Sequence, residues 1–373
     1  MIFNEVPFIA LVFVTVLTFF SVPVRWRQGV LILSGILFYA WAGGPFLPLV
    51  LSVILVTRLA PLRAAIWINA AVLVGLMSYF KMRGTFPLGL SFLAFEMIHF
   101  SIERRRGKIP EVSLAGLAAF ALYFPCRIAG PIKRYQPFAE SIRSSRASAE
   151  NLYRGSVRIL WGYLKKVVVA DFFALFTPYL NYPDTTAPFL WVSLFALSLY
   201  IYVDFSAYSD MAIGISQLLG LSVPENFRLP YFSRNIRDFW ARWHISLSTW
   251  LGDYLFLPIA KKLAVSSRIL KPKTAVVVSY LVTFALCGLW HGPSMHFLLW
   301  GLYQGLLLSL YAIYAASGFS FGRFSLRGEW GRRLGAVVFP LMTFSAVTFG
   351  WLFFQLEPQR AFTVILKLLG VER

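Results

Sequence analysis

The chain has 373 residues, of which 58% are hydrophobic and only 14% are charged, whereas an ordinary soluble domain has about 25% charged residues. This composition excludes a set of soluble domains, because many apolar stretches reach the roughly 17 to 25 residues that cross a bilayer as a helix. The net charge of +19 does not indicate nucleic-acid binding, since the basic residues form short clusters between apolar runs. We therefore predict an all-α, polytopic integral membrane protein that contacts the lipid bilayer and no nucleic acid.

Apolar segments follow one another along the whole chain. Phe46–Thr57 and Leu247–Ala260 are too short for a perpendicular crossing and are predicted to be re-entrant or interfacial. We expect roughly ten transmembrane helices in a single membrane-embedded domain over residues 1–373. The other segments are Val6–Val22, Val30–Ala42, Ala64–Phe80, Phe86–Ile102, Val112–Ala129, Val167–Tyr182, Phe189–Leu219, Thr274–Trp290, Met295–Ser317 and Leu334–Phe354.

Basic clusters between these segments predict the orientation of the chain. The stretch Lys133–Lys166 holds eight basic residues against two acidic ones, so it is placed in the cytoplasm. The loop Asn181–Pro188 has no basic residue and one Asp, and it is placed outside. Further basic groups expected in the cytoplasm are Arg25 with Arg27, Arg104–Arg106 with Lys108, Lys271 with Lys273, and Arg323 to Arg333.

His291 interrupts residues 274–322, which contain no Asp, Glu, Lys or Arg. An ionisable residue at membrane depth is costly and indicates a functional site. The segment Thr274–Trp290 spans about 25 Å at about 1.5 Å per residue, so His291 is expected near its outer end but within the protein. An imidazole there is suited to general-base catalysis near neutral pH. It could deprotonate a hydroxyl acceptor that attacks an acyl thioester, without a covalent enzyme intermediate.

A second polar stretch runs from Tyr200 to Tyr254. It begins with carboxylates and hydroxyls in an apolar helix and ends in Arg237-Asp-Phe-Trp-Ala-Arg-Trp-His244. A cytoplasmic loop of solvated arginines with interfacial aromatic anchors would have this composition. A water-filled cavity open to the cytoplasm is the alternative, in which arginines hold an anionic donor.

The remaining histidines differ in their surroundings. His244 belongs to the Arg/Trp/Asp cluster and is expected to be functional. His99 is expected to be a hydrogen-bonded structural residue near Glu96, whereas His296 could line the cavity or only pack. The chain has no G-x-S-x-G motif and no Cys/His cluster, so neither a serine-hydrolase mechanism nor a metal site is predicted.

The sequence resembles the membrane-bound O-acyltransferase family, particularly its bacterial alginate O-acetyltransferase branch. Leu37–Trp41, Pro87–Phe92 and Ala129–Ile132 look like its N-terminal half. The central motifs are Tyr202-Val-Asp-Phe-Ser-Ala-Tyr-Ser-Asp-Met-Ala-Ile-Gly214, Pro224-Glu-Asn-Phe227, Arg237-Asp-Phe-Trp-Ala-Arg-Trp-His-Ile-Ser-Leu-Ser248 and Gly288-Leu-Trp-His-Gly292.

This resemblance implies helices around a central tunnel, where a cytoplasmic thioester donor (acetyl-CoA or an acyl carrier) meets an acceptor from the other face. It also implies a bacterial inner-membrane location and an extracytoplasmic partner that carries the acyl group to a polysaccharide. His291 would be the essential histidine and His244 the supporting one, with no bound cofactor or metal. Candidate substrate-binding residues are Trp290, Asp210, Asn226, Arg237, Arg242, Trp243 and Ser246.

The C-terminal part departs from the resemblance. The chain ends soon after Trp351-Leu-Phe-Phe-Gln-Leu356, where the alginate branch continues into further helices, so we expect a C-terminally short version of the domain. An O-acetyltransferase for cell-envelope or exported polysaccharide is the leading hypothesis. D-alanyl transfer to teichoic acid from a carrier protein is the nearest alternative. A transporter or channel, or a scaffold without activity, would also be a membrane protein of this composition.

Overall fold

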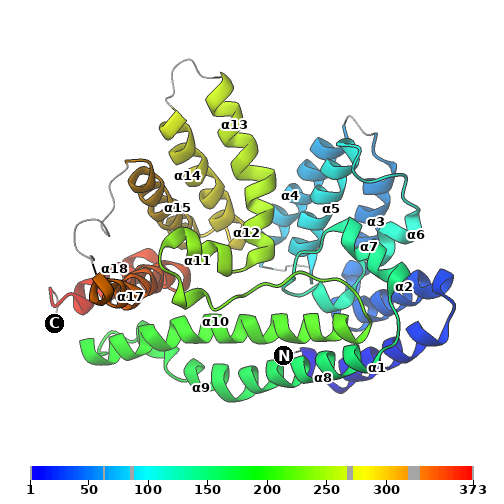
Figure 1. Cartoon of the computed structure of the whole chain (residues 1–373), viewed down its shortest axis with the longest axis horizontal. Coiled ribbons are helices and arrows are strands. Elements are labelled where there is room, and N and C mark those ends of the chain that lie inside the picture. Colours follow the sequence, from blue (N-terminus) through cyan, green and yellow to red (C-terminus); the bar gives the residue numbers. More distant parts are fainter. Residues whose placement is uncertain (1, 62–63, 85–87, 267–271, 318–327, 372–373) are drawn as a thin grey trace. The chain divides into compact units, whose positions relative to one another are not determined.

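A computed structural model describes all of the chain except residues 1, 62–63, 85–87, 267–271, 318–327 and 372–373. Every regular element in the described part is helical, which confirms the predicted fold class (Figure 1). The chain forms two compact units. Unit 1 comprises Met1–Lys165 and Phe205–Glu225, and unit 2 comprises Lys166–Asp204 and Asn226–Arg373. The long helix α10 (Ala187–Leu218) contributes residues to both.

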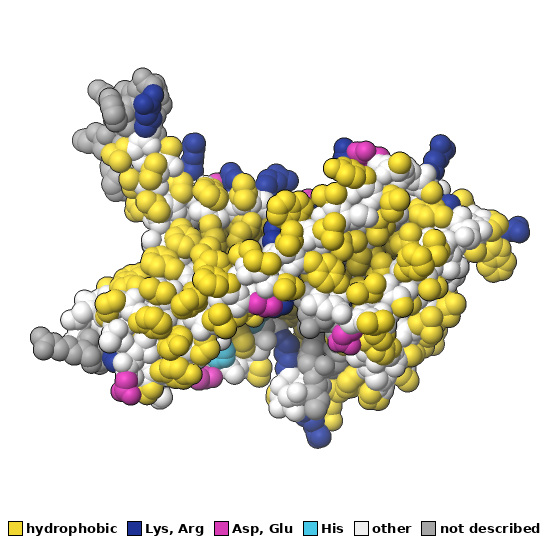
Figure 2. Space-filling view, turned by 90° about the horizontal axis from the view of Figure 1, so that it is seen from below, with side chains coloured by type: hydrophobic (Ala, Val, Ile, Leu, Met, Phe, Trp, Pro, Cys, Tyr) yellow, Lys and Arg dark blue, Asp and Glu magenta, His cyan; other side chains and the backbone are white. Residues whose placement is uncertain are grey.

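Several helices are long and apolar enough to cross a membrane. The described residues contain five such stretches, and α1 (Val6–Ser21) is a shorter apolar helix. The five are Val24–Leu59, Ala187–Leu218, Lys273–His291, Met295–Ala316 and Arg333–Gln355. Hydrophobic side chains cover much of the face drawn in Figure 2, as expected for a surface in contact with lipid. The total of roughly ten crossings stays a prediction.

Four sequence-based assignments touch residues outside the described part of the chain. They are the start of the segment Phe86–Ile102, the Pro87 that opens one motif, Lys271, and the start of the basic group at Arg323.

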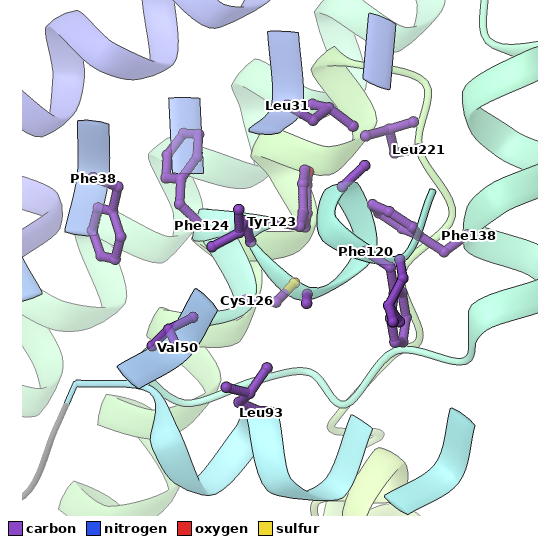
Figure 3. Close-up of a cluster of buried hydrophobic side chains, with 14 of the residues drawn as sticks. Leu31, Phe38, Val50, Leu93, Phe120, Tyr123, Phe124, Cys126, Phe138 and Leu221 are labelled. Carbon is purple, nitrogen blue, oxygen red and sulfur yellow. The ribbon is translucent and has the colours of Figure 1, made fainter. Parts of the chain in front are cut away.

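Unit 1 is built around a core of aromatic and aliphatic side chains. Phe38, Phe124, Tyr123 and Phe120 are almost completely buried in this core (Figure 3). Besides α1, the helices that enclose it are α2 (Arg27–Phe38), α3 (Leu47–Leu59), α4 (Ala65–Arg83), α5 (Leu90–Arg105), α6 (Leu114–Ala121), α7 (Tyr135–Ser144) and α8 (Ala149–Leu164).

Two parts of unit 1 differ from the sequence-based expectation. The segment Val112–Ala129 is not one continuous helix, because α6 ends at Ala121 and a short 3-10 turn containing Pro125 follows. The basic stretch Lys133–Lys166 contains two helices, α7 and α8. The Ser148 side chain caps α8 by accepting a hydrogen bond from the Asn151 N–H at 3.0 Å. Both helices are amphipathic, so their apolar residues form no continuous run that predicts them.

His99 has the structural role that was expected, but with other partners. Its Nε2 accepts a hydrogen bond from the Tyr135 backbone N–H at 3.0 Å. Glu96 forms ion pairs with Arg127 and Lys133 instead, and all three side chains are fully buried. A carboxylate shared by two buried cations fixes the loop after α6 against α5.

Unit 2 contains His291 and the part of the second polar stretch that includes His244, whereas residues 205–225 of that stretch belong to unit 1. The segment Val167–Tyr182 is broken into a π-helical turn, α9 (Asp171–Ala174) and a 3-10 turn (Thr177–Asn181). The later helices are α11 (Ile236–Arg242), α12 (Ile245–Leu251), α13 (Leu257–Ser266), α14 (Pro272–His291), α15 (Met295–Ala316), α17 (Gly328–Gln355) and α18 (Pro358–Leu368), with a π-helical turn (Gly252–Phe256) between α12 and α13.

Helices α14 and α15 form a tight hairpin that positions His291. A Cβ atom on Gly288 would overlap the Phe297 carbonyl oxygen, and one on Gly301 would overlap that of Phe284. Only glycine permits this approach of two helix backbones. The hairpin therefore sets the distance between the end of α14 and the side chains of α15.

Candidate active site

His291 is the last residue of α14 and lies, partly buried, among aromatic rings. The Trp300 ring of α15 is perpendicular to the imidazole at a centroid distance of 5.2 Å, and the Phe354 ring of α17 is perpendicular at 4.9 Å. The neighbouring Trp290 ring lies at 4.4 Å and Phe297 at 6.0 Å. Rings on these sides surround the imidazole with apolar surface, which reduces its contact with water.

His244 lies between α11 and α12 and is 4% exposed. Its backbone is in the left-handed region, with φ of 40°, which is uncommon for a residue other than glycine. Burial lowers the pKa of His244 to about 3, so the ring is neutral at physiological pH. His244 therefore bears no charge that could hold an anionic substrate.

Hydrogen bonds hold the two motifs around His244 together. The Ile245 N–H donates to the Asn226 carbonyl oxygen at 2.9 Å, and the Ser246 hydroxyl donates to Asn226 Oδ1 at 2.6 Å. The Arg228 N–H donates to the Arg242 carbonyl oxygen at 3.0 Å. Asn226 and Ser246, both predicted substrate-binding residues, thus bond to each other and tie the segment after Pro224 to the turn at His244.

A series of aromatic rings connects the two histidine regions. Trp243, next to His244, lies 5.1 Å from Trp351 of α17. Trp351 stacks against Trp300 at 6.0 Å, and Trp300 contacts His291. Sequence reasoning missed Trp300, Trp351 and Phe354, because an aromatic residue in an apolar helix carries no signal of its neighbours.

The predicted arginines take different positions. Arg242 pairs with Asp238 one turn earlier, with Nε 2.7 Å from Oδ1. Arg237 is exposed and lies at the rim of a cavity of about 240 Å³. The remaining candidate, Asp210, belongs to unit 1, where it pairs with Lys165 at 2.6 Å and Arg158 at 3.1 Å. Its role in substrate binding stays a prediction.

His296 packs against Phe297, with ring centroids 3.9 Å apart, and its Nδ1 lies 3.3 Å from the Phe353 carbonyl oxygen. These contacts favour packing for this residue. No group of three or more His, Cys, Asp or Glu that could hold a metal ion occurs in the part of the chain that the structure describes.

Comparison with known proteins identifies the family of this chain. The family model of the membrane-bound O-acyltransferases matches residues 33–349. The chain belongs to this family. It is therefore a multi-pass membrane enzyme with acyltransferase activity, as the motifs around His244 and His291 predict.

Relatives in this family differ in the group that they transfer. The chain is 31% identical to a probable alginate O-acetylase of Pseudomonas syringae pv. tomato, over 89% of the chain and 68% of the relative. It is 30% identical to a teichoic acid D-alanyltransferase of Bacillus subtilis, over 73% and 69%. A peptidoglycan O-acetyltransferase of Helicobacter pylori is 31% identical over 67% of the chain and 45% of the relative. Acetyl and D-alanyl transfer both occur among these relatives.

Proposed function

We propose that this membrane-bound O-acyltransferase moves an acetyl group from a cytoplasmic thioester donor to a hydroxyl of a cell-envelope or exported polysaccharide. The observation that carries the proposal is the position of His291, an imidazole among aromatic rings at the end of a helix that has no charged residue after Lys273. The similarity to probable alginate O-acetylases supports the acetyl group and the polysaccharide acceptor. The proposed location is the bacterial cytoplasmic membrane.

The proposed reaction uses His291 as general base. A ring nitrogen takes the proton of the acceptor hydroxyl while the hydroxyl oxygen attacks the thioester carbonyl carbon. The carbon–sulfur bond then breaks, and the imidazolium returns its proton to the departing thiolate. The products are an ester and a thiol, and the enzyme regains its neutral imidazole. No cofactor is needed, because the thioester itself supplies the activated acyl group.

His244 is proposed to be a positioning residue. It is neutral and buried, and the hydrogen bonds on either side of it join the Asn226 segment to α12. Trp243 then packs against Trp351, which contacts the rings around His291. Loss of the His244 side chain is therefore expected to disturb the geometry of the base without removing the base itself.

Replacement of the base tests the assignment. His291→Ala is expected to lower the rate of acetyl transfer by about 10² to 10⁴, the usual contribution of a positioned general base. The assay uses the purified full-length chain with radiolabelled acetyl-CoA and a polysaccharide acceptor. Leu289→Ala is the matched control, because Leu289 is an exposed neighbour on the same helix. Wild-type rates in a folded His291→Ala protein would remove His291 from the mechanism.

A second candidate function is D-alanyl transfer, because two teichoic acid D-alanyltransferases are among the similar proteins. The two functions differ in the mass added to the acceptor. Mass spectrometry of envelope glycans from cells with wild-type protein or His291→Ala would identify the acyl group and the acceptor together. An extracytoplasmic protein that accepts the acyl group would appear as an acetylated intermediate in the same cells.

A further inference from the structure

A cavity of about 240 Å³ lies within unit 2, bounded by α11, α12 and the following π-helical turn on one side and by α14 and α15 on the other. Arg237 and Thr249 at its rim are exposed, whereas Trp240, Thr283 and Phe284 at its inner end are buried. The cavity thus leads from solvent-accessible polar groups to a buried, mostly apolar end.

Thr283 is the unusual residue of this cavity. It is 1% exposed, and its hydroxyl has no hydrogen-bond partner among the residues that the structure describes. Hydroxyls in apolar helices ordinarily bond to a carbonyl of the preceding turn, as Ser279 does on the same helix, donating to the Ala275 oxygen at 2.6 Å. A buried hydroxyl that makes no such bond is costly unless a ligand supplies the acceptor.

The inner end of the cavity adjoins the rings around His291. Trp240 lines the cavity and lies 6.2 Å from Trp300, which contacts His291 at 5.2 Å. Thr283 precedes His291 by eight residues on α14, a rise of about 12 Å. A ligand that extends from Arg237 past Thr283 therefore points toward the proposed base.

The lining selects for one of the two substrates. Apolar walls suit a slender arm and disfavour a polysaccharide, whose many hydroxyls would lose their hydration without replacement. Thr283 supplies the hydroxyl among the buried residues of the lining, which matches an isolated carbonyl oxygen. The guanidinium of Arg237 at the rim matches a phosphate. Acetyl-CoA and an acyl carrier protein share this chemistry, a thioester on an amide-containing arm that ends in a phosphate.

We propose that Thr283 is a specificity-determining residue that donates a hydrogen bond to an amide carbonyl of the donor's arm, while Arg237 pairs with the phosphate of that arm. This inference rests on the proposed acyl transfer, and it assigns the cavity to the donor and not to the acceptor. Thr283 fixes how far the arm enters, and hence where the thioester carbon stops relative to His291.

The test compares Thr283→Val, which removes the hydroxyl at nearly constant shape, with Thr283→Ser, which retains it. Ser279→Ala is the matched control, since its hydroxyl bonds to its own helix. Thr283→Val is expected to raise the KM for acetyl-CoA about tenfold, the effect of one lost hydrogen bond, with the KM for the acceptor unchanged. Thr283→Ser and Ser279→Ala should resemble the wild type. The same KM measurements with an acetylated carrier protein as donor test the second molecule that could supply the arm.

Arg237 is tested with a shortened donor. Arg237→Gln should raise the KM for acetyl-CoA but not for an acetyl thioester of the amide arm that lacks the phosphate, whereas Thr283→Val should weaken both donors. Calorimetry of coenzyme A binding to each purified variant measures the affinity of the donor site independently of acyl transfer. If the wild type binds coenzyme A through Thr283 but transfers no acetyl group, the proposed function fails and the donor site stands.

Two results would overturn the donor site. In one, the wild type transfers acetyl groups and Thr283→Val leaves the donor KM unchanged or raises the KM of the acceptor instead. In the other, Thr283→Val and Ser279→Ala change the KM equally and lower the thermal midpoint equally, as helix packing alone would. Either result leaves acyl transfer by His291 intact.

Discussion

His244 combines two unfavourable features, a left-handed backbone and a buried imidazole. A non-glycine residue in this conformation costs about 1–3 kcal/mol and persists where the surrounding structure enforces it. Here the enforcement comes from the bonds of Asn226 to Ile245 and Ser246. Strain of this kind is concentrated at functional sites, which agrees with the position of His244 beside the rings that lead to His291.

The neutral state of His244 makes the stability of the protein depend on pH. Burial lowers its pKa from 6.5 to about 3, so between these values the unfolded chain binds a proton that the folded chain does not. Stability is therefore lost as the pH falls below 6.5. Relative to His244→Asn, which tolerates the left-handed backbone, the wild type should lose about 2 kcal/mol between about pH 7 and 5.

Thermal midpoints of the two proteins in detergent at both pH values measure this difference. The other histidines contribute equally to the wild type and to His244→Asn, so they cancel in the comparison. Parallel pH profiles would show that His244 can be protonated in the folded state.

At the level of single residues, the sequence identifies those that differ from their surroundings. His291 stands out because residues 274–322 contain no Asp, Glu, Lys or Arg and one other histidine, His296. Thr283 does not stand out, because threonines in apolar helices usually bond to their own backbone, and only coordinates reveal the exception. The bond between Asn226 and Ser246 likewise joins residues 20 positions apart and has no local signature.

Among the elements, the α14–α15 hairpin holds the base by direct contact of helix backbones. Gly301→Ala is expected to separate the helices, because the new Cβ meets the Phe284 carbonyl oxygen. Overpacking of this kind costs about 1–3 kcal/mol, and a small displacement of His291 should also lower acetyl transfer.

The comparison is made by thermal midpoint and acetyl-transfer rate. The control is Gly29→Ala on α2, where a Cβ meets no atom within 4 Å and alanine should be neutral or stabilising. An active, fully stable Gly301→Ala protein would show that the close approach of α14 and α15 is not needed.

Helices with long apolar runs were predictable, and amphipathic ones were not. The sequence located α1, α10, α14, α15 and α17 to within a few residues, because apolar length alone marks them. It missed α7, α8 and α18, whose polar residues alternate with buried ones at helical spacing. Segments with interior prolines, such as Val112–Ala129, were predicted too long, since the pattern of apolar residues continues through the break.

For the molecule as a whole, charge asymmetry predicts which side each loop faces. The basic stretch Lys133–Lys166 is expected in the cytoplasm and the loop Asn181–Pro188 outside. Arg146 and Asp184 are exposed representatives of the two regions. The two native cysteines, Cys126 and Cys287, are buried and should add little background labelling.

Labelling of intact cells with a membrane-impermeant maleimide tests this orientation. Asp184→Cys should react from outside, whereas Arg146→Cys should react only after the membrane is permeabilised. The physical reason is that transfer of a loop with eight basic residues across the bilayer is strongly disfavoured. Labelling of both positions from the same side would show that the predicted side of one of these loops is wrong.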